Sequence, residues 1–121
     1  MRLMVCGGRY FYNKELLESS LDEFIKDNRW RTEDIAILEG GATGADTLAE
    51  EYAKKKGFTF IVYPADWEKY GKAAGPIRNK QMVEDCDYCV AFWDGQSKGT
   101  KSSIDFCKFL NKPCKIIYYN K

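Results

Sequence analysis

The hydrophobic residues of this chain fall into short runs that alternate with longer segments of helical periodicity. Several runs are apolar throughout and rich in β-branched and aromatic residues, which is typical of strands covered on both faces of a sheet. We therefore expect strands at residues 2–6, 34–38, 58–63, 88–93 and 114–119.

The segments between these runs place apolar side chains three and four positions apart, which predicts amphipathic helices. Asn13 is suited to cap the first helix and Gly57 to end the second, because these residue types favour such positions. The expected helices cover residues 14–27, 45–56, 76–85 and 100–111.

The alternation of strand and helix predicts the fold class. We expect an α/β protein with a single Rossmann-like three-layer domain over residues 1–121, a mainly parallel five-stranded sheet and helices on both faces. The connection at residues 64–75 is long for this class, and long loops often carry function.

The bulk composition narrows the class of protein. The 121 residues carry a formal net charge of only +1, whereas proteins that bind long nucleic-acid duplexes are usually clearly basic. No stretch approaches the ~20 apolar residues of a membrane span, and the first residues lack the pattern of a secretion signal. We expect a cytoplasmic protein without a membrane partner, and the charge speaks against a nucleic-acid partner.

Cysteine and histidine usage bears on metal binding and catalysis. The five cysteines lie mostly inside apolar runs, as buried thiols do, and the pair Cys86 and Cys89 matches the CxxC spacing. There is no second such pair and no histidine, so we expect no metal site and no cofactor. The lack of histidine also removes the commonest general base.

The candidate chemistry lies in the turns that follow the strands. In open parallel sheets ligands bind beyond the carboxyl ends of the strands, where the strand order reverses. Three turns expected there are rich in glycine, at residues 7–9, 40–44 and 94–100. Glycine lets the backbone approach a ligand closely, and the first N–H groups of a helix are unpaired. The turns therefore predict a phosphate at the helix starts near 44 and 100.

Several side chains in these turns suit a nucleotide. Thr43 and Thr100 offer hydroxyl groups, Arg9 and Arg78 offer charged donors, and Asp46 offers an acceptor for a ribose hydroxyl.

Simpler interpretations stand beside these. The glycines also suit tight turns and close helix–sheet packing, Asp46 also suits the helix dipole, and Arg78 also suits a solvated helix face. Trp67 fits either the core or a stacking position at the rim, and Trp93 is expected to pack at the end of its strand. The GxxxGT pattern at 95–100 lacks the lysine of a P-loop.

Three segments resemble the short YspA/YpsA-related proteins of the SLOG superfamily. They read GGATGADTLAEEYAKKKG, PADWEKYGKAAGPIRNKQM and DYCVAFWDGQSKGT, and the opening CGGRYFYN resembles the first glycine turn of that group. The match runs from residue 3 to nearly the end of the chain with its spacing kept. The resemblance implies a Rossmann-like fold that binds nucleotides or nucleotide-derived ligands. Distant relatives are the lonely-guy phosphoribohydrolases and DprA.

The resemblance also implies binding positions in all the turns. The set includes Thr43 and Asp94, at which this chain departs from the pattern of the group. The positions are Gly7, Gly8, Arg9, Gly40, Gly41, Thr43, Gly44, Asp46, Asp66, Trp67, Lys72, Gly75, Arg78, Asn79, Asp94, Gly95, Gly99 and Thr100. Thr43 stands where the group often has arginine. Trp93 and Asp94 replace a proline and a glycine, which narrows the pocket and adds a negative charge.

The same resemblance argues against catalysis. Phosphoribohydrolase relatives carry a catalytic glutamate where this chain has Ser103, and Asp105 lies about 200° further round the helix axis. We therefore expect no catalytic residue and favour a module that binds a nucleotide-derived small molecule as a sensor, carrier or sink. The alternative is a hydrolase of a nucleotide glycosidic bond that uses Asp46 or Asp94.

The sequence also bears on two other partners, single-stranded DNA and a second copy of the chain. DNA-uptake relatives bind single-stranded DNA, but the near-neutral charge of this chain disfavours a basic strand-binding groove. The surplus of aromatic residues suits self-association as a homodimer or a higher homo-oligomer, although ordinary packing at the edge of the sheet explains it equally well. These residues are Tyr10, Phe11, Tyr12, Tyr118 and Tyr119.

Overall fold

The expected alternation of strands and helices is present in the computed structural model, which describes residues 1–120. The five strands form one sheet in the order β3-β2-β1-β4-β5, and each neighbouring pair is parallel. They are β1 (Arg2–Gly7), β2 (Ala36–Glu39), β3 (Thr59–Val62), β4 (Tyr88–Trp93) and β5 (Cys114–Tyr118). The predicted Rossmann-like α/β fold is therefore confirmed.

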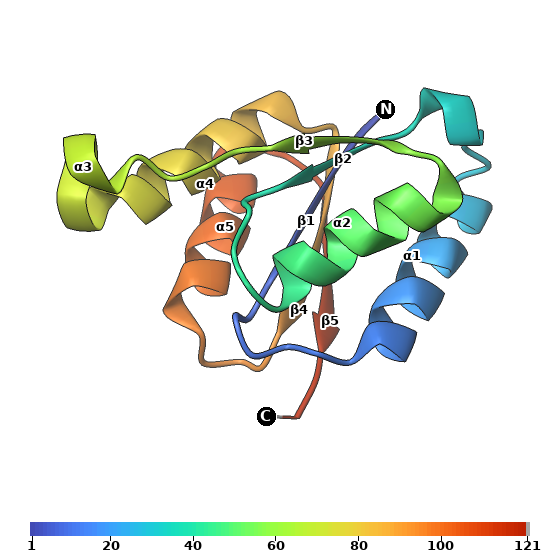
Figure 1. Cartoon of the computed structure of the whole chain (residues 1–121), viewed down its shortest axis with the longest axis horizontal. Coiled ribbons are helices and arrows are strands. Elements are labelled where there is room, and N and C mark those ends of the chain that lie inside the picture. Colours follow the sequence, from blue (N-terminus) through green and yellow to red (C-terminus); the bar gives the residue numbers. More distant parts are fainter. Residues whose placement is uncertain (121) are drawn as a thin grey trace.

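Helices cover both faces of the sheet (Figure 1). On one face lie α1 and α2, and on the other lie α4 and α5. The α-helices are α1 (Lys14–Asp27), α2 (Ala45–Lys56), α3 (Trp67–Tyr70), α4 (Ala74–Asp85) and α5 (Lys98–Phe109), and two short 3₁₀ helices are η1 (Thr32–Asp34) and η2 (Gly71–Ala73). None of the helices in residues 1–120 is long and apolar enough to cross a membrane.

The core has two apolar layers, one on each side of the sheet. Alternate residues of β1 enter different layers, with Leu3 and Val5 on the side of α1 and α2 and with Met4 and Cys6 on the side of α4 and α5. Because successive side chains of a strand point to opposite faces, a strand covered on both faces must be apolar throughout. This explains the continuous apolar run of β1.

The third expected strand differs from this picture. β3 pairs only with β2 and forms an edge of the sheet, so its residues Ile61 and Val62 are each 40% exposed. The apolar run at residues 58–63 therefore belongs to a partly exposed edge strand and not to a strand buried on both faces.

The helix boundaries agree with the sequence at α1 and α2. Asn13 caps α1 through its Oδ1 atom, which accepts a hydrogen bond from the Leu16 N–H at 3.0 Å. Gly57 ends α2 with a left-handed φ of 77°.

Other boundaries differ. α4 and α5 begin earlier than expected, so Pro76 lies within the first turn of α4, where a backbone N–H has no partner inside the helix. The connection at 64–75 contains α3 and η2, and Asp66 caps α3 by accepting from the Lys69 N–H at 3.1 Å. A helix as short as α3 has no periodicity that the sequence pattern can reveal.

The topology determines where a ligand can enter. The chain first adds strands on one side of β1 and then crosses over to add β4 on its other side. The connections that leave β1 and β4 therefore diverge to opposite faces, and a crevice opens beyond the carboxyl ends of these two strands. Gly7, at the end of β1, pairs with Phe92 of β4 and so marks the base of that crevice.

Two glycines at the ends of α2 allow a matched test of this arrangement. Both have positive φ, 75° at Gly44 and 77° at Gly57, but their surroundings differ. A Cβ atom at Gly44 would collide with the backbone of Gly8 and Arg9, whereas a Cβ atom at Gly57 would meet nothing within 4 Å. We predict that Gly57→Ala lowers the free energy of unfolding by about 1–2 kcal/mol, the cost of a left-handed conformation.

Gly44→Ala should cost at least about 2 kcal/mol more, because overpacking is added to the backbone strain. Urea denaturation of both variants measures the difference. Equal losses would show that the first two glycine turns are not in close contact.

Candidate functional site

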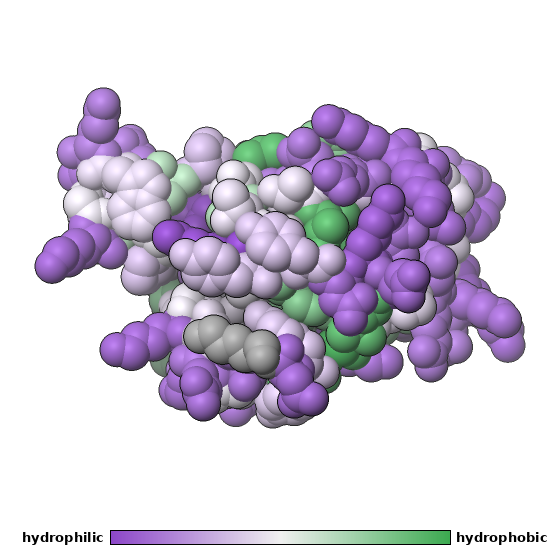
Figure 2. Space-filling view, turned by 60° about the horizontal axis from the view of Figure 1, so that its bottom comes forward, coloured by the Kyte–Doolittle hydropathy of each residue, from purple (hydrophilic) through white to green (hydrophobic). Residues whose placement is uncertain are grey.

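A pocket of about 1120 Å³ lies at the carboxyl ends of β1 and β4 and is large enough for a nucleotide. Figure 2 turns this end of the molecule toward the viewer and shows pale side chains of intermediate hydropathy among strongly hydrophilic ones. Eleven of the residues expected from the sequence line this main pocket. They are Gly7, Gly8, Arg9, Gly40, Asp46, Gly75, Arg78, Asn79, Asp94, Gly99 and Thr100.

A second, smaller hollow of about 470 Å³ adjoins the main pocket. The two share Arg9, Gly40, Ala42 and Arg78 in their walls. Three further residues expected from the sequence lie here and not in the main pocket, namely Gly41, Thr43 and Trp67. The predicted site is thus divided between two neighbouring cavities.

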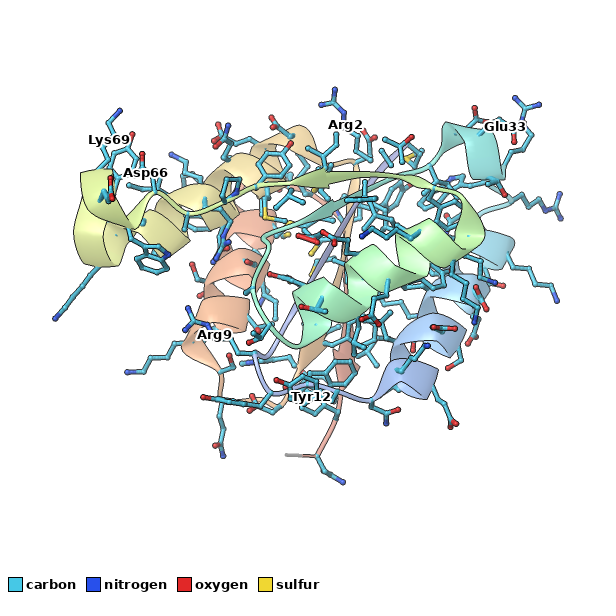
Figure 3. The ribbon with its side chains drawn as sticks, viewed as in Figure 1. Arg2, Arg9, Tyr12, Glu33, Asp66 and Lys69 are labelled. Carbon is cyan, nitrogen blue, oxygen red and sulfur yellow. The ribbon has the colours of Figure 1, made fainter. Side chains whose placement is uncertain are left out.

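Four of the expected residues line neither cavity: Gly44, Asp66, Lys72 and Gly95. Asp66 caps α3, and Figure 3 shows its side chain at the far side of α3, away from Arg9. Lys72 is exposed on η2, and Gly95 has a φ of 85° in its turn. For Asp66 and Gly95 the role in the local backbone explains the residue type without a ligand.

The first two glycine turns are joined to each other. Thr43 donates its hydroxyl hydrogen to the Arg9 carbonyl at 3.1 Å, and the Ala45 N–H donates to the Gly8 carbonyl at 3.2 Å. The hydroxyl hydrogen of Thr43 is therefore committed to the protein, and Gly44 serves the close packing of the two turns. The simpler interpretation of the glycines holds at this position.

Arg78 connects α4 to the turn after β2. Its Nη1 atom donates to the Gly40 carbonyl at 2.7 Å and to the Tyr63 carbonyl at 3.3 Å, and its Nε atom donates to Asn79 Oδ1 at 2.8 Å. The side chain is half-buried, so Arg78 is not a solvated helix residue. It holds a positive charge at the boundary between the two cavities.

Arg9 supplies a second positive charge at the same boundary. It follows the first two glycines, is exposed and lies beyond the end of β1 beside the second glycine turn (Figure 3). Within residues 1–120 no hydrogen bond or ion pair engages its guanidinium group. Its positive charge acts to lower the pKa of Asp46, against the larger effect of burial, which raises that pKa. Arg9 is therefore better placed than Arg78 to bind an anion directly.

Two buried carboxyl groups hold the second glycine turn. Glu39 is 1% exposed at the end of β2, and its Oε1 atom accepts from the Gly41 N–H at 2.6 Å. Burial, with a contribution from the charge of Asp46, raises the pKa of Glu39 to about 8. Asp46 accepts from the Ala42 N–H at 3.2 Å, and burial raises its pKa to about 6.

Sequence reasoning identified Asp46 but missed Glu39. The available signal was an acidic residue that closes an otherwise apolar strand directly before two glycines. Such a residue must either turn outward or be buried with partners, and the hydrogen bond to Gly41 shows that it is buried.

The last turn is shaped by Asp94 and opens onto α5. The Asp94 Oδ1 atom accepts from the Gln96 N–H at 2.9 Å and the Ser97 N–H at 2.7 Å. Thr100 and Ser103 follow on the inner side of α5, where they are 3% and 1% exposed and line the main pocket. The turn therefore presents the start of α5 to the pocket.

Aromatic residues surround the main pocket. Tyr10 and Tyr12 are 81% and 63% exposed and line it, whereas Tyr119 packs against Phe11 at a ring-centroid distance of 4.5 Å. Trp93 donates its indole N–H to the Ser97 carbonyl at 3.0 Å, so it packs at the end of its strand as expected.

Three cysteines from different elements meet in the layer beneath α5. The sulfur atoms of Cys89, Cys107 and Cys114 all lie within 4.8 Å of one another, and the Cys6 sulfur lies 3.9 Å from that of Cys89. Hydrogen bonds from Cys107 and Cys89 lower the pKa of Cys114, and hydrogen bonding and burial raise the pKa of Cys89. The spacing along the chain did not reveal this cluster.

A family model described as the YspA, cpYpsA-related SLOG family matches residues 1–70. The Gene 61 protein of Mycobacterium phage D29 is 31% identical over 126 residues, which cover 93% of this chain and 98% of the phage protein. The resemblance to YspA-related proteins is therefore confirmed.

Two solved structures share the fold. DNA processing protein A (DprA) from Streptococcus pneumoniae matches 98% of this chain with a TM-score of 0.75 and 17% identity, and the match covers 50% of that protein. DNA processing protein A from Helicobacter pylori, which has a single-stranded DNA binding mode, matches 99% with a TM-score of 0.73 and 18% identity over 66% of its length. At these identities the similarity establishes the fold alone.

These structures correct one expectation. The near-neutral net charge spoke against a nucleic-acid partner, but the Helicobacter pylori protein with the same fold binds single-stranded DNA. That expectation was wrong because net charge averages over the whole surface. It does not reveal that Arg9 and Arg78 lie together at the boundary of the two cavities.

The buried carboxyl groups predict a pH dependence of stability. The pKa values of Glu39 (about 8) and Asp46 (about 6) exceed those of carboxyl groups in an unfolded chain, which are about 4. The folded protein therefore binds more protons than the unfolded chain between about pH 4 and pH 8. Its free energy of unfolding should fall as the pH rises through this window.

Glu39→Gln should remove most of the slope of the unfolding free energy against pH, because glutamine keeps an oxygen for the Gly41 N–H but cannot ionise. Glu51→Gln, at an exposed position of α2, is the matched control and should leave the slope unchanged. Urea denaturation at a series of pH values provides the comparison. An unaltered slope in Glu39→Gln would contradict the assignment.

The cysteines are predicted to hold no metal. Cys86 donates its thiol to the Val83 carbonyl at 3.4 Å, and the other thiols hydrogen-bond to one another, so none of them requires a metal as a partner. Elemental analysis of the purified protein should find no stoichiometric zinc. One zinc per chain that disappears in Cys107→Ser would overturn this prediction.

Proposed function

The chain belongs to the YspA, cpYpsA-related SLOG family, and on that premise we propose that it binds a phosphate-bearing, nucleotide-derived small molecule in the main pocket. The protein acts as a sensor, a carrier or a sink for that molecule. The observation that carries the proposal is the convergence of two arginines and the glycine turns at residues 7–9, 40–44 and 94–100 on one pocket beyond the ends of β1 and β4.

The phosphate is assigned to the part of the pocket between the last turn and Arg9. The first N–H groups of α5 have no partner inside the helix, and the positive end of its dipole faces the same region. Asp94 holds the preceding turn by its bonds to Gln96 and Ser97, so the start of α5 is ordered before a ligand arrives. Arg9, which is exposed and lines the same pocket, adds a charged donor.

The sugar is assigned to Asp46. Its Oδ2 atom accepts from the Ala42 N–H, and the backbone of Gly40 also hydrogen-bonds to this carboxylate. A carboxylate has about four acceptor sites, so Asp46 keeps capacity for a ribose hydroxyl. Asp46 lies at the start of α2 and lines the main pocket on the side opposite α5. A nucleotide with its phosphate at α5 therefore carries its sugar toward α2.

The acids that are present support binding without turnover. By the resemblance, Ser103 stands where phosphoribohydrolases carry their glutamate, and it lines the pocket without a carboxylate. Asp46, with a pKa raised to about 6, is the residue that supports the alternative of a glycosidic-bond hydrolase, since general acids and bases work best near neutral pKa.

A second candidate is single-stranded DNA. It is favoured by the binding mode of the Helicobacter pylori protein, whose fold this chain shares over two thirds of that protein's length. In this case the same turns would contact the phosphates of a strand.

Calorimetry with nucleoside monophosphates and with inorganic phosphate tests the proposal. We predict that at least one nucleotide binds to the wild type and that Arg9→Ala weakens it by about 1.5–3 kcal/mol, which is roughly ten- to 150-fold in Kd. Arg31→Ala, at the opposite end of the sheet beside η1, is the matched control and should bind normally. Equal affinities in wild type and Arg9→Ala would remove Arg9 from the site.

The same nucleotides should be recovered intact after incubation with the protein. Release of free base faster than about one per second would place the protein among enzymes of ordinary rate. Loss of that release in Asp46→Asn would then identify the catalytic carboxylate and reject binding without turnover.

A further inference from the structure

We infer that the smaller hollow is a second base-binding subsite, so that the ligand carries two nucleotide units joined by phosphate across Arg9 and Arg78. This inference rests on the proposed function, because it assigns the first unit to the main pocket. It names the class of ligand as a dinucleotide, either linked by pyrophosphate or part of a DNA strand.

The two cavities share a cationic boundary. Both arginines stand in the walls of both cavities, together with Gly40 and Ala42. Arg78 cannot turn away from this boundary, because its hydrogen bonds to the Gly40 and Tyr63 carbonyls fix it. A phosphate linker at this point would therefore have positive charge on either side of it, with a cavity for each of the groups that it joins.

The smaller hollow presents an aromatic surface that its neighbours hold in place. Trp67 is the first residue of α3, and its side chain is 50% exposed. Asp66 caps this helix and so fixes the point at which it starts. A Cβ atom at Gly75 would lie 3.5 Å from the Trp67 Cη2 atom, so the edge of the indole rests on the backbone of α4. One part of the ring is thus supported while another part faces the hollow.

The hollow also has an apolar wall. Val62, at the end of β3, and Pro64 both line it and are exposed. A flat indole and an apolar wall form the kind of slot in which nucleobases stack, and such stacking tolerates any base because every base has a π-face. No charged side chain other than the two arginines lines this hollow among the described residues.

The main pocket has an aromatic surface of its own. Tyr10 and Tyr12 line it and are largely exposed, and Figure 3 shows Tyr12 at the bottom of the view, with Arg9 between it and α3. The order across the site is therefore tyrosines, arginines and then Trp67. This order matches base, phosphate and base in a dinucleotide.

Calorimetry with AMP, P1,P2-diadenosine diphosphate and 5′-phosphorylated deoxyadenylates of two, four and eight residues tests the inference. The wild type should bind a dinucleotide at least about fivefold more tightly than AMP, because a stacked base adds about 1–3 kcal/mol. Trp67→Ala should abolish the gain and leave the affinity for AMP unchanged. Trp67→Phe should keep most of the gain, since it keeps an aromatic face.

Tyr70→Ala provides the matched control. Tyr70 lies on the same short helix and is 41% exposed, but it lines neither cavity. Its removal should change neither affinity. The difference in emission between the wild type and Trp67→Phe isolates the fluorescence of Trp67, which should change on addition of a dinucleotide but not of AMP.

The outcomes separate the inference from the proposed function. No binding of any nucleotide would reject the proposed function itself. Binding of AMP with no gain for dinucleotides, or a gain that survives in Trp67→Ala, would overturn only the second subsite. A change in the sedimentation of ligand-free Trp67→Ala without a change in dinucleotide affinity would assign Trp67 to self-association and overturn it equally.

The source of the dinucleotide follows from the length series. If diadenosine diphosphate already shows the whole Trp67-dependent gain in affinity over AMP, the ligand is a small molecule linked by pyrophosphate. A gain that appears with deoxyadenylates and grows from two to eight residues identifies a DNA strand. Both results support two adjacent base subsites.

Discussion

The hydrogen bond from Arg78 to the Gly40 carbonyl is the contact on which the geometry of the site depends. It joins α4, which covers one face of the sheet, to the turn that leads into α2 on the other face. The other hydrogen bonds of the second glycine turn run to the first turn, to its own strand and to the start of α2. Through the bond from Arg78, α4 and α2, which lie on opposite faces of the sheet, hold the same turn.

The charges at this contact nearly balance. Two positive groups, Arg9 and Arg78, stand beside two buried carboxyl groups, Glu39 and Asp46, which hold the N–H groups of Gly41 and Ala42. Because burial raises the pKa of Glu39 to about 8, this group carries little negative charge at neutral pH, and Asp46 is the charged acid beside the two arginines. The acids therefore shape the turn without cancelling the charge that an anionic ligand needs.

Much of the fold could be predicted because its signals are periodic. The apolar run of β1 and the helical spacing of the apolar residues in α1 and α2 reflect which faces of these elements are buried. The pattern of apolar residues along the chain therefore predicts them. The pocket edge was also predictable, because parallel strands bring the turns that follow them to the same end of the sheet.

Other features depend on tertiary contacts that no local pattern carries. Glu39 stands in an apolar run, and only its bond to Gly41 shows why it is there. Thr43 has the residue type of a ligand donor but donates to Arg9 instead. Trp67 belongs to the expected site but lies in the smaller hollow, because α3, which is too short to predict, carries it there.

The central claim is that a nucleotide phosphate binds at the glycine turns beyond β1 and β4. Amide chemical shifts of the ¹⁵N-labelled protein during titration with a nucleotide test it most directly, since the chain is 14.0 kDa and well suited to NMR. The account predicts that the largest shift changes cluster at residues 7–9, 40–44 and 94–100. Changes confined to the amino ends of the strands, near η1, would contradict it, as would a spectrum that no nucleotide alters.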